Sequence, residues 1–157
     1  MGKPPIDAVA VFVRGESGYF CIKIPYLFYT HSGVLLALAE ARGLNGSSCN
    51  DFTGTDLVFK RSYDLGNTWS DLKVLVSSNS TEEHTVVVGN AAPVQDLHSK
   101  RLFIPFVKNN EDAYMMYSDD NGASFSAPIS MPHLTLDSWK WVGLGPPGGI
   151  QVGIMTF

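Results

Sequence analysis

The sequence predicts an all-β fold built from repeated antiparallel units, and a duplicated eight-residue motif is the first observation behind this prediction. The motif Ser62-Tyr63-Asp64-Leu65-Gly66-Asn67-Thr68-Trp69 returns 56 positions later as Ser118-Asp119-Asp120-Asn121-Gly122-Ala123-Ser124-Phe125. Both copies hold a serine, an aspartate and a glycine at the same places, followed by a hydroxyl residue and a large ring. Repetition at a fixed spacing indicates a structural unit that the chain uses twice.

Strand-like runs at 57–61 and 113–117 precede the two copies, which is the second observation. In such a motif an aspartate can bond backbone amides nearby, and a glycine permits a positive φ, so each copy describes a β-hairpin turn. We therefore interpret the motif residues as structural and not catalytic. They are Ser62, Asp64, Gly66, Thr68 and Trp69 in the first copy, and Ser118, Asp120, Gly122, Ser124 and Phe125 in the second.

The pattern S-x-D-x-G-x-[ST]-[WF] resembles the Asp-box of sialidases and other β-propellers. Repeats of about 40 to 50 residues are typical of propeller blades, and a closed ring needs roughly four to eight blades. We expect a partial propeller: two to three four-stranded antiparallel blades of a six-bladed ring, with Asp-box hairpins. The expected units span about 19–76 and 85–131, and a third begins at 139–157. Because an open arc leaves strand edges unpaired, the missing C-terminal half of the propeller is an expected partner.

The composition favours a soluble, β-rich protein, with 45% hydrophobic residues, 17% charged residues and a formal net charge of −4. The chain has no basic surplus that would favour nucleic acid, and its longest apolar run, 34–39, is too short to span a membrane. We recognise no signal peptide. This leaves a cytoplasmic location, or a lysosomal or secreted one if the true N-terminus differs. The four histidines lack metal-ligand spacing, so we expect neither a metal nor a cofactor.

Period-two and continuous apolar runs predict the strands, and a polar stretch at 43–55 predicts a loop between two of them. Pro105 within its run indicates an edge or a bulge. Cys21 and Cys49 could pair or remain free, and the two glycosylation sequons at Asn45 and Asn79 matter only in the secretory pathway. The expected strands are 6–13, 19–25, 26–30, 34–42, 56–61, 74–76, 85–88, 89–94, 102–107 and 113–117.

Several further segments resemble the sialidase (neuraminidase) family and occur in the order of that family. Together they run from about residue 19 to the end, and they are similar to roughly the N-terminal half of a six-bladed sialidase propeller. The segments are Lys23-Ile24-Pro25 where the family usually has Arg-Ile-Pro, 35–42 resembling its L-L-A-x-x-E-x-R strand, 51–62, 89–94 and 145–151.

The resemblance implies a reaction on sialic acid, whose anomeric carbon carries a carboxylate. Such a site needs fixed cations for that carboxylate and an acid for the departing oxygen, and sialidases use a tyrosine as nucleophile. Asp51 occupies the position that corresponds to the acid/base aspartate of the family. Asn50 and Asp56 are the alternatives, and without the resemblance Asp51 would be interpreted as a solvated or turn-capping loop residue.

Arg42 resembles the pocket arginine of the family near the substrate's 4-hydroxyl and the acid, and the alternative is a strand-end arginine paired with a nearby carboxylate. Lys23 replaces the first of three arginines that clamp the carboxylate in the family, which keeps the charge but loses the planar fork. Asn90, with Pro93, resembles a rim loop near the N-acyl group. Trp139 and Trp141 could stack on a sugar, but their spacing favours core positions.

In the family the other two clamp arginines, the nucleophilic tyrosine and its glutamate partner lie in later blades. We therefore expect the 157 residues alone to be inactive. Within a complete propeller the resemblance implies retaining hydrolysis of terminal α-linked sialic acids on glycoproteins, glycolipids and oligosaccharides, without a cofactor. A catalytically inactive module that binds carbohydrate or protein is the alternative.

Overall fold

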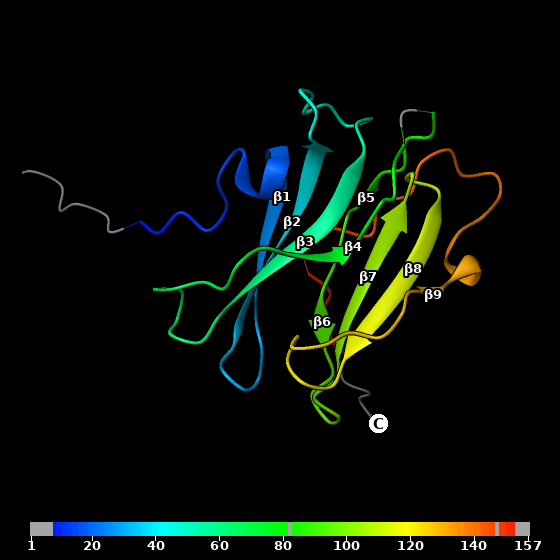
Figure 1. Cartoon of the computed structure of the whole chain (residues 1–157). Helices are drawn as coiled ribbons and strands as arrows, with labels where there is room; N and C mark the ends of the chain where they lie inside the picture. The colour runs from blue at the N-terminus through cyan, green and yellow to red at the C-terminus, as the bar shows by residue number, and fades with distance from the viewer. Residues whose placement is uncertain (1–7, 82, 147, 153–157) are drawn as a thin grey trace, which may run out of the picture.

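The computed structural model describes residues 8–81, 83–146 and 148–152, and its regular structure there is almost wholly β. Figure 1 shows two twisted antiparallel sheets side by side. Helical structure in these ranges is confined to two 3₁₀ turns, η1 (Glu16–Gly18) and η2 (Pro132–Leu134). The first sheet has the order β1-β2-β3-β4, with strands Tyr19–Tyr29, Leu35–Leu44, Thr55–Ser62 and Lys73–Val76.

The second sheet has five strands, two of which pair with the same edge of β7. Its order is β5-β7-β8-β9, and the short β6 pairs with β7 beyond the end of β5. The two sheets are linked by a parallel bridge between Thr55 and Val87. This arrangement confirms the predicted all-β fold with antiparallel blades. The strands are Val88–Gly89 (β5), Val94–Gln95 (β6), Leu102–Lys108 (β7), Asp112–Ser118 (β8) and Ile129–Ser130 (β9).

The main core lies between the two sheets and follows the period-two pattern of their strands. Leu36 and Leu38 of β2 face the second sheet, and Ile104 and Phe106 of β7 face the first. All four side chains are at most 2% exposed. Burying each one stabilises the fold by about 1.5 to 3 kcal/mol. The opposite face of β2 carries small residues, Ala37, Ala39 and Ala41, which let a second cluster around Tyr19 and Val58 pack closely.

The expected strands 6–13, 85–88 and 89–94 are wrong in whole or in part, since of residues 85–94 only 88–89 and 94 lie in strands. No strand forms at residues 8–13 of the expected strand 6–13, whose first two residues lie outside the described ranges. Instead Phe12 packs onto the small-residue face of β2. For Pro105 the structure shows the second of the two expected positions, a bulge, because β7 pairs with strands on both sides and its register shifts by one residue between Gly89↔Val107 and Val94↔Phe103. The missing N–H of Pro105 falls in the interval between β5 and β6, where no ladder bond is required.

The two Asp-boxes fold into turns with the same hydrogen bonds. In the first copy Ser62 Oγ donates to Asp64 Oδ1 (2.8 Å) and accepts from the Gly66 amide (2.8 Å). Asp64 then accepts from the Thr68 amide (2.9 Å) and hydroxyl (2.6 Å). Gly66 has a φ of 91°, which a side chain would disfavour. The second copy repeats these four distances with Ser118, Asp120, Gly122 and Ser124.

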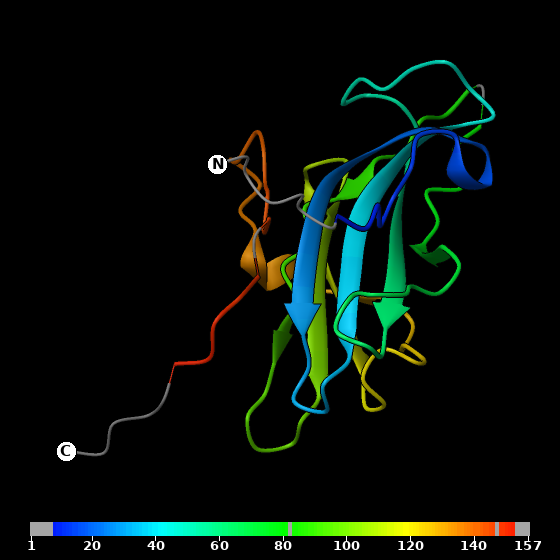
Figure 2. The same cartoon turned by 90° about the vertical axis from the view of Figure 1, so that its left-hand side faces the viewer.

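Both Asp-box turns lie at the end of the sheets that is opposite to the loop between β2 and β3 (Figure 1). Figure 2 shows that loop, coloured cyan, at the far end of β2 from the turn that joins β1 to β2. The rings of the boxes pack beneath their hairpins: Phe125 meets Phe59 edge to face with 5.3 Å between ring centroids. The boxes thus close the strands at one end and leave the other end to the candidate site.

Candidate active site

The loop 45–54 between β2 and β3 carries Asp51 and is fastened at both sides. At its base the Gly43 amide donates to the Gly54 carbonyl (3.1 Å). Near its tip a disulfide joins Cys49 to Cys21 of β1, with Cα atoms 5.8 Å apart, a separation normal for disulfides. The sequence left this pairing open. The disulfide holds the segment just before Asp51 against the first strand.

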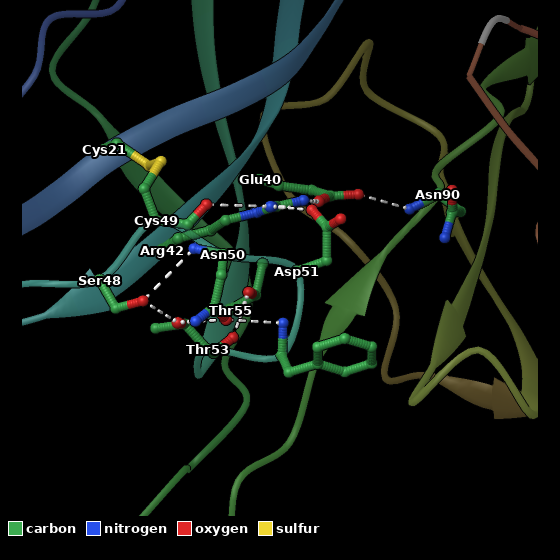
Figure 3. A network of polar contacts seen from close by, with 11 residues as sticks. Cys21, Glu40, Arg42, Ser48, Cys49, Asn50, Asp51, Thr53, Thr55 and Asn90 are labelled. Carbon is green, nitrogen blue, oxygen red and sulfur yellow. Dashed lines mark hydrogen bonds and ion pairs between the residues drawn. A yellow bond between two sulfur atoms is a disulfide. The ribbon is translucent and has the colours of Figure 1, made fainter.

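Arg42 of β2 meets Asp51, so the structure brings together the two residues that the resemblance singled out (Figure 3). Arg42 Nη1 donates to Asp51 Oδ1 and to the Cys49 carbonyl (3.4 Å), while Nη2 donates to Glu40 Oε2 (2.6 Å). The side chain of Arg42 is 4% exposed and that of Asp51 is 77% exposed. A buried guanidinium therefore presents one of its nitrogens to a carboxylate at the surface.

The charges of this cluster favour ionised forms. The hydrogen bond from Arg42, and then its charge, lowers the pKa of Asp51, and Lys23 adds a smaller contribution in the same direction. Burial by itself lowers the pKa of Arg42, but its hydrogen bonds to Glu40 and Asp51 outweigh burial and raise it. In the state described, Asp51 is thus a carboxylate near neutral pH, held by a permanent cation.

Lys23 lies on β1, directly across the ladder from Glu40 of β2. Its surroundings are shaped by a bulge, because the register of β1 shifts between Lys23 and Tyr26. Ile24 within the bulge has a φ of 52°, a region that β-branched residues seldom adopt. Bulges re-aim side chains and occur often beside functional sites. Because Lys23 pairs with Glu40 in the ladder, its exposed side chain lies on the side of the sheet that carries Glu40 and Arg42.

Asn90 reaches the cluster through its backbone. Its amide donates to Glu40 Oε1 (3.0 Å), and its φ of 53° turns the chain just after β5. The other residue of the expected rim segment, Pro93, is fully buried. The contact from Asn90 thus comes from the second sheet and joins a carboxylate of the first.

The two alternatives to Asp51 have structural partners of their own. Asp56 is 5% exposed and accepts from the Tyr19 hydroxyl (2.6 Å) and from the Ser78 amide (2.6 Å). Burial, with the bond to Asp56, raises the pKa of Tyr19 well above its usual range. Asn50 Oδ1 accepts from the Phe52 amide (3.0 Å) within the turn. Of these three neighbours, Asp51 is the one whose side chain contacts Arg42.

The core positions expected for the two tryptophans near the C-terminus are wrong. Trp139 is 51% exposed and Trp141 is 63% exposed. The described residues after them carry no strand. One of them, Gly149, donates from its amide to the Pro93 carbonyl (3.0 Å), so this segment runs beside the chain that follows β5.

A polar cleft of about 710 Å³ lies beside the loop of Asp51, between residues 43–46 and 53–54 on one side and 77–81 on the other. Neither Arg42 nor Asp51 lines it. A second cavity, next to Glu40 and Ala91, holds only about 10 Å³. The carboxylate of Asp51 is exposed beside the polar cleft, whereas the guanidinium of Arg42 is buried.

Two other kinds of site are missing from the described ranges. Among those residues no three His, Cys, Asp or Glu side chains are grouped closely enough to hold a metal ion. The same ranges contain no helix with the length and hydropathy needed to cross a bilayer.

The chain resembles two curated fungal proteins, each named exo-alpha-sialidase. It is 27% identical over 168 residues to the protein from Aspergillus fumigatus and 27% identical over 167 residues to that from Arthroderma benhamiae. Each match covers 86% of this chain and 39% of the relative. The chain thus spans about two fifths of the length of these relatives. No known family profile matches it.

Solved sialidases share the fold. A Hadza microbial sialidase, Hz136, has a TM-score of 0.62 at 22% identity, covering 72% of this chain and 26% of that one. A Trypanosoma rangeli sialidase in complex with 2,3-difluorosialic acid has a TM-score of 0.64 at 18% identity, covering 84% and 26%. The fold is therefore that of part of a sialidase propeller. Together with the two fungal relatives, it confirms the resemblance of this chain to the exo-α-sialidase family.

Two features of the site escaped the sequence reading. The strand pattern at 35–42 includes Glu40 without assigning it a role, although a lone acid that follows the apolar run 35–39 and precedes Arg42 by two positions is itself a signal. The pairing of Cys21 with Cys49 was undecided, because it depends on the register of β1 against β2, which places Cys21 opposite Arg42.

Proposed function

We propose that this chain supplies the acid/base side of a retaining exo-α-sialidase. In a complete propeller the substrates would be terminal α-linked sialic acids on glycoproteins, glycolipids and oligosaccharides. The observation that carries the proposal is the contact between Arg42 and the exposed Asp51, at the end of the sheets away from the Asp-boxes. The nucleophile and further cations would come from outside the 157 residues.

Each side chain has a role that its chemistry supports. Asp51 would protonate the departing glycosidic oxygen and later activate water, as the acid/base of a retaining enzyme does. Arg42, flanked by two carboxylates, has little net charge to offer an anion and is better suited to a neutral hydroxyl of the sugar. Lys23 would face the substrate carboxylate as a point charge. Asn90 would contribute to the rim of the site.

The pKa of Asp51 sets a condition on this mechanism. Because Arg42 lowers that pKa, Asp51 is a poor acid while the contact lasts. Bound sugar would have to exclude water from Asp51 and loosen its contact with Arg42 before Asp51 could hold a proton. Desolvation of a carboxyl by substrate raises its pKa and thus acts in the required direction.

The test is turnover of a fluorogenic α-sialoside. Sequencing the transcript on both sides of the codons for these 157 residues defines the complete gene product. That product and the 157-residue chain are then expressed and assayed in parallel. We expect activity in the complete product only. A complete product with further Asp-boxes that binds sialic acid without turning it over would contradict the proposal.

A binding module without catalysis is the second candidate, and two observations favour it. Lys23 stands where the family usually has an arginine, and Asp51 is held as a carboxylate by Arg42. Such a module would bind sialylated glycans through the same surface. Saturable binding of N-acetylneuraminic acid with no release of sugar from a sialoside would decide in its favour.

A further inference from the structure

Glu40 is a buried carboxylate with both oxygens occupied. It is 5% exposed in the middle of β2, after an apolar stretch of that strand. Oε2 accepts from Arg42 Nη2 (2.6 Å) and Oε1 accepts from the amide of Asn90 (3.0 Å). A buried carboxylate is tolerated only when a cation and hydrogen bonds compensate its lost hydration. Glu40 has both, one from each sheet.

The end of β5 is shaped to receive this carboxylate. A Cβ atom at Gly89 would lie 2.7 Å from Glu40 Cδ, too close for any real contact. The backbone of Gly89 is not in the left-handed region, so space and not φ requires the glycine. The next residue, Asn90, is in that region with a φ of 53° and aims its amide at Glu40. Two consecutive residues of the second sheet thus fit one side chain of the first.

The guanidinium of Arg42 carries this constraint to Asp51. Its nitrogens lie in one rigid plane, so fixing Nη2 also fixes the direction of Nη1. Nη1 donates to Asp51 and to the Cys49 carbonyl, and Nε has no acceptor among the described residues. Glu40 is therefore the buried partner that orients the plane. The charged groups around Asp51 are Arg42 from β2 and Lys23 from β1.

We propose, resting on the proposed function of the site, that Glu40 is a positioning residue: anchored by the Asn90 amide, its carboxylate orients Arg42 so that Nη1 meets Asp51. The acid/base carboxylate on the first sheet is then placed by a turn of the second sheet. Glu40 itself does not touch the substrate. Its effect is exerted through Arg42.

Two substitutions that conserve every charge test this link. Glu40→Asp shortens the side chain by one methylene, so the carboxylate cannot reach both Arg42 and Asn90. Gly89→Ala leaves Glu40 intact but places a methyl group where its carboxylate lies. Glu111→Asp, at an exposed turn, is the matched control for the shortening. Because no charge changes, an altered titration of Asp51 reports a change of position.

The readouts are NMR measurements on the 157-residue chain. In both variants we expect the titration midpoint of the Asp51 carboxyl to rise toward its ordinary value, and the Asn90 amide to exchange about tenfold faster. The control should match the wild type. An unchanged Asp51 midpoint in a folded Glu40→Asp chain would overturn the proposal. So would rapid exchange of the Asn90 amide in the wild type, a measurement that does not depend on any variant folding.

Addition of N-acetylneuraminic acid to the complete gene product, with and without the two substitutions, separates this proposal from the proposed function, because the 157 residues alone are expected to hold only part of the site. Perturbation of the Asp51 and Arg42 signals in the wild type, weakened in both variants, would support both. If the sugar perturbs neither signal while the variants still shift the Asp51 midpoint, the proposed function is contradicted and the link from Glu40 to Asp51 stands. If the sugar perturbs the signals equally in all chains, the positioning role of Glu40 is contradicted.

Discussion

The two ends of the sheets hold their aspartates in opposite ways. Asp64 and Asp120 are fixed inside their own turns, each by hydrogen bonds with residues two and four positions away. Asp51 is 77% exposed, and its described partner is Arg42, nine positions earlier on another element. A carboxylate with all its bonds made locally can only stabilise, whereas one held by a single cation can exchange that partner for a ligand.

The largest expected effect is a loss of catalytic activity when Asp51, at the end of the sheets away from the Asp-boxes, is replaced. In the complete gene product, Asp51→Asn should lower kcat/KM for a sialoside by about 10²- to 10⁴-fold, because an amide cannot transfer the proton. The free energy of unfolding should fall by no more than about 1 kcal/mol, since the ion pair that is lost with Arg42 has its carboxylate at the surface. Sialoside kinetics and urea unfolding measure the two quantities. Unchanged turnover would remove Asp51 from the mechanism.

The next largest effect is the loss of stability expected when the disulfide that holds loop 45–54 to β1 is removed. Removing the disulfide with Cys21→Ser and Cys49→Ser should lower the free energy of unfolding by about 3 kcal/mol, because the bridge closes a loop across a sequence separation of 28. Urea unfolding of the chain, oxidised and reduced, measures this effect. Hydrogen exchange should increase in loop 45–54 and stay unchanged in the Asp-box turns. Equal increases at both ends would contradict the separation of the two regions.

A smaller loss of stability is expected when the buried serine of either Asp-box is replaced, and it should be similar in the two boxes. Ser62 is 1% exposed and Ser118 is 2% exposed, and each accepts from a glycine amide at 2.8 Å. Ser62→Ala and Ser118→Ala should each cost about 1 to 2 kcal/mol of stability, because each leaves that amide unpaired. The costs should add in the double variant, since the boxes lie in different sheets. Chemical denaturation of the three chains checks both statements.

Acid should weaken the boxes over a narrow range of pH. Hydrogen bonds, chiefly from Thr68 and Ser124, lower the pKa of Asp64 and of Asp120 to about 2. A lowered folded-state pKa contributes stability above the ordinary carboxyl pKa, and the contribution is lost as pH falls through the folded value. Stability should thus decline between about pH 4 and pH 2.

The variant Asp64→Asn with Asp120→Asn isolates the carboxyl contribution to that decline. Its free energy of unfolding should depend less steeply on pH across the same interval, measured by urea unfolding at a series of pH values. An equal slope in both chains would show that other groups cause the decline.

Whether a contact could be predicted from the sequence depends on how many positions separate its two residues. The Asp-box turns could be predicted because all their bonds join residues at most four positions apart. The pairing of Arg42 with Asp51 came from the family resemblance together with a simple strand-end reading. The bond from Asn90 to Glu40 spans 50 positions, and it depends on how two sheets pack. No local pattern encodes such a contact.

The wrong expectations have a related cause. The weak apolar alternation at 6–13 fits a strand pattern, but among residues 8–13 Phe12 packs onto the small-residue face of β2, Val9 and Val13 are exposed, and no strand forms. The spacing of Trp139 and Trp141 alone predicts core positions, but the described residues around them form no strand and both side chains are exposed. Period-two patterns identify a strand only when a partner is present.

The bulge at Ile24 also affects the outer edge of β1, which is the terminal strand of its sheet. A straight edge strand offers a continuous row of donors and acceptors on which another molecule can add its own strand. Here that row is interrupted halfway by a kink, by Pro25, which has no N–H, and by the charge of Lys23. The residues that shape the candidate site therefore also protect the molecule against edge-to-edge association into fibrils.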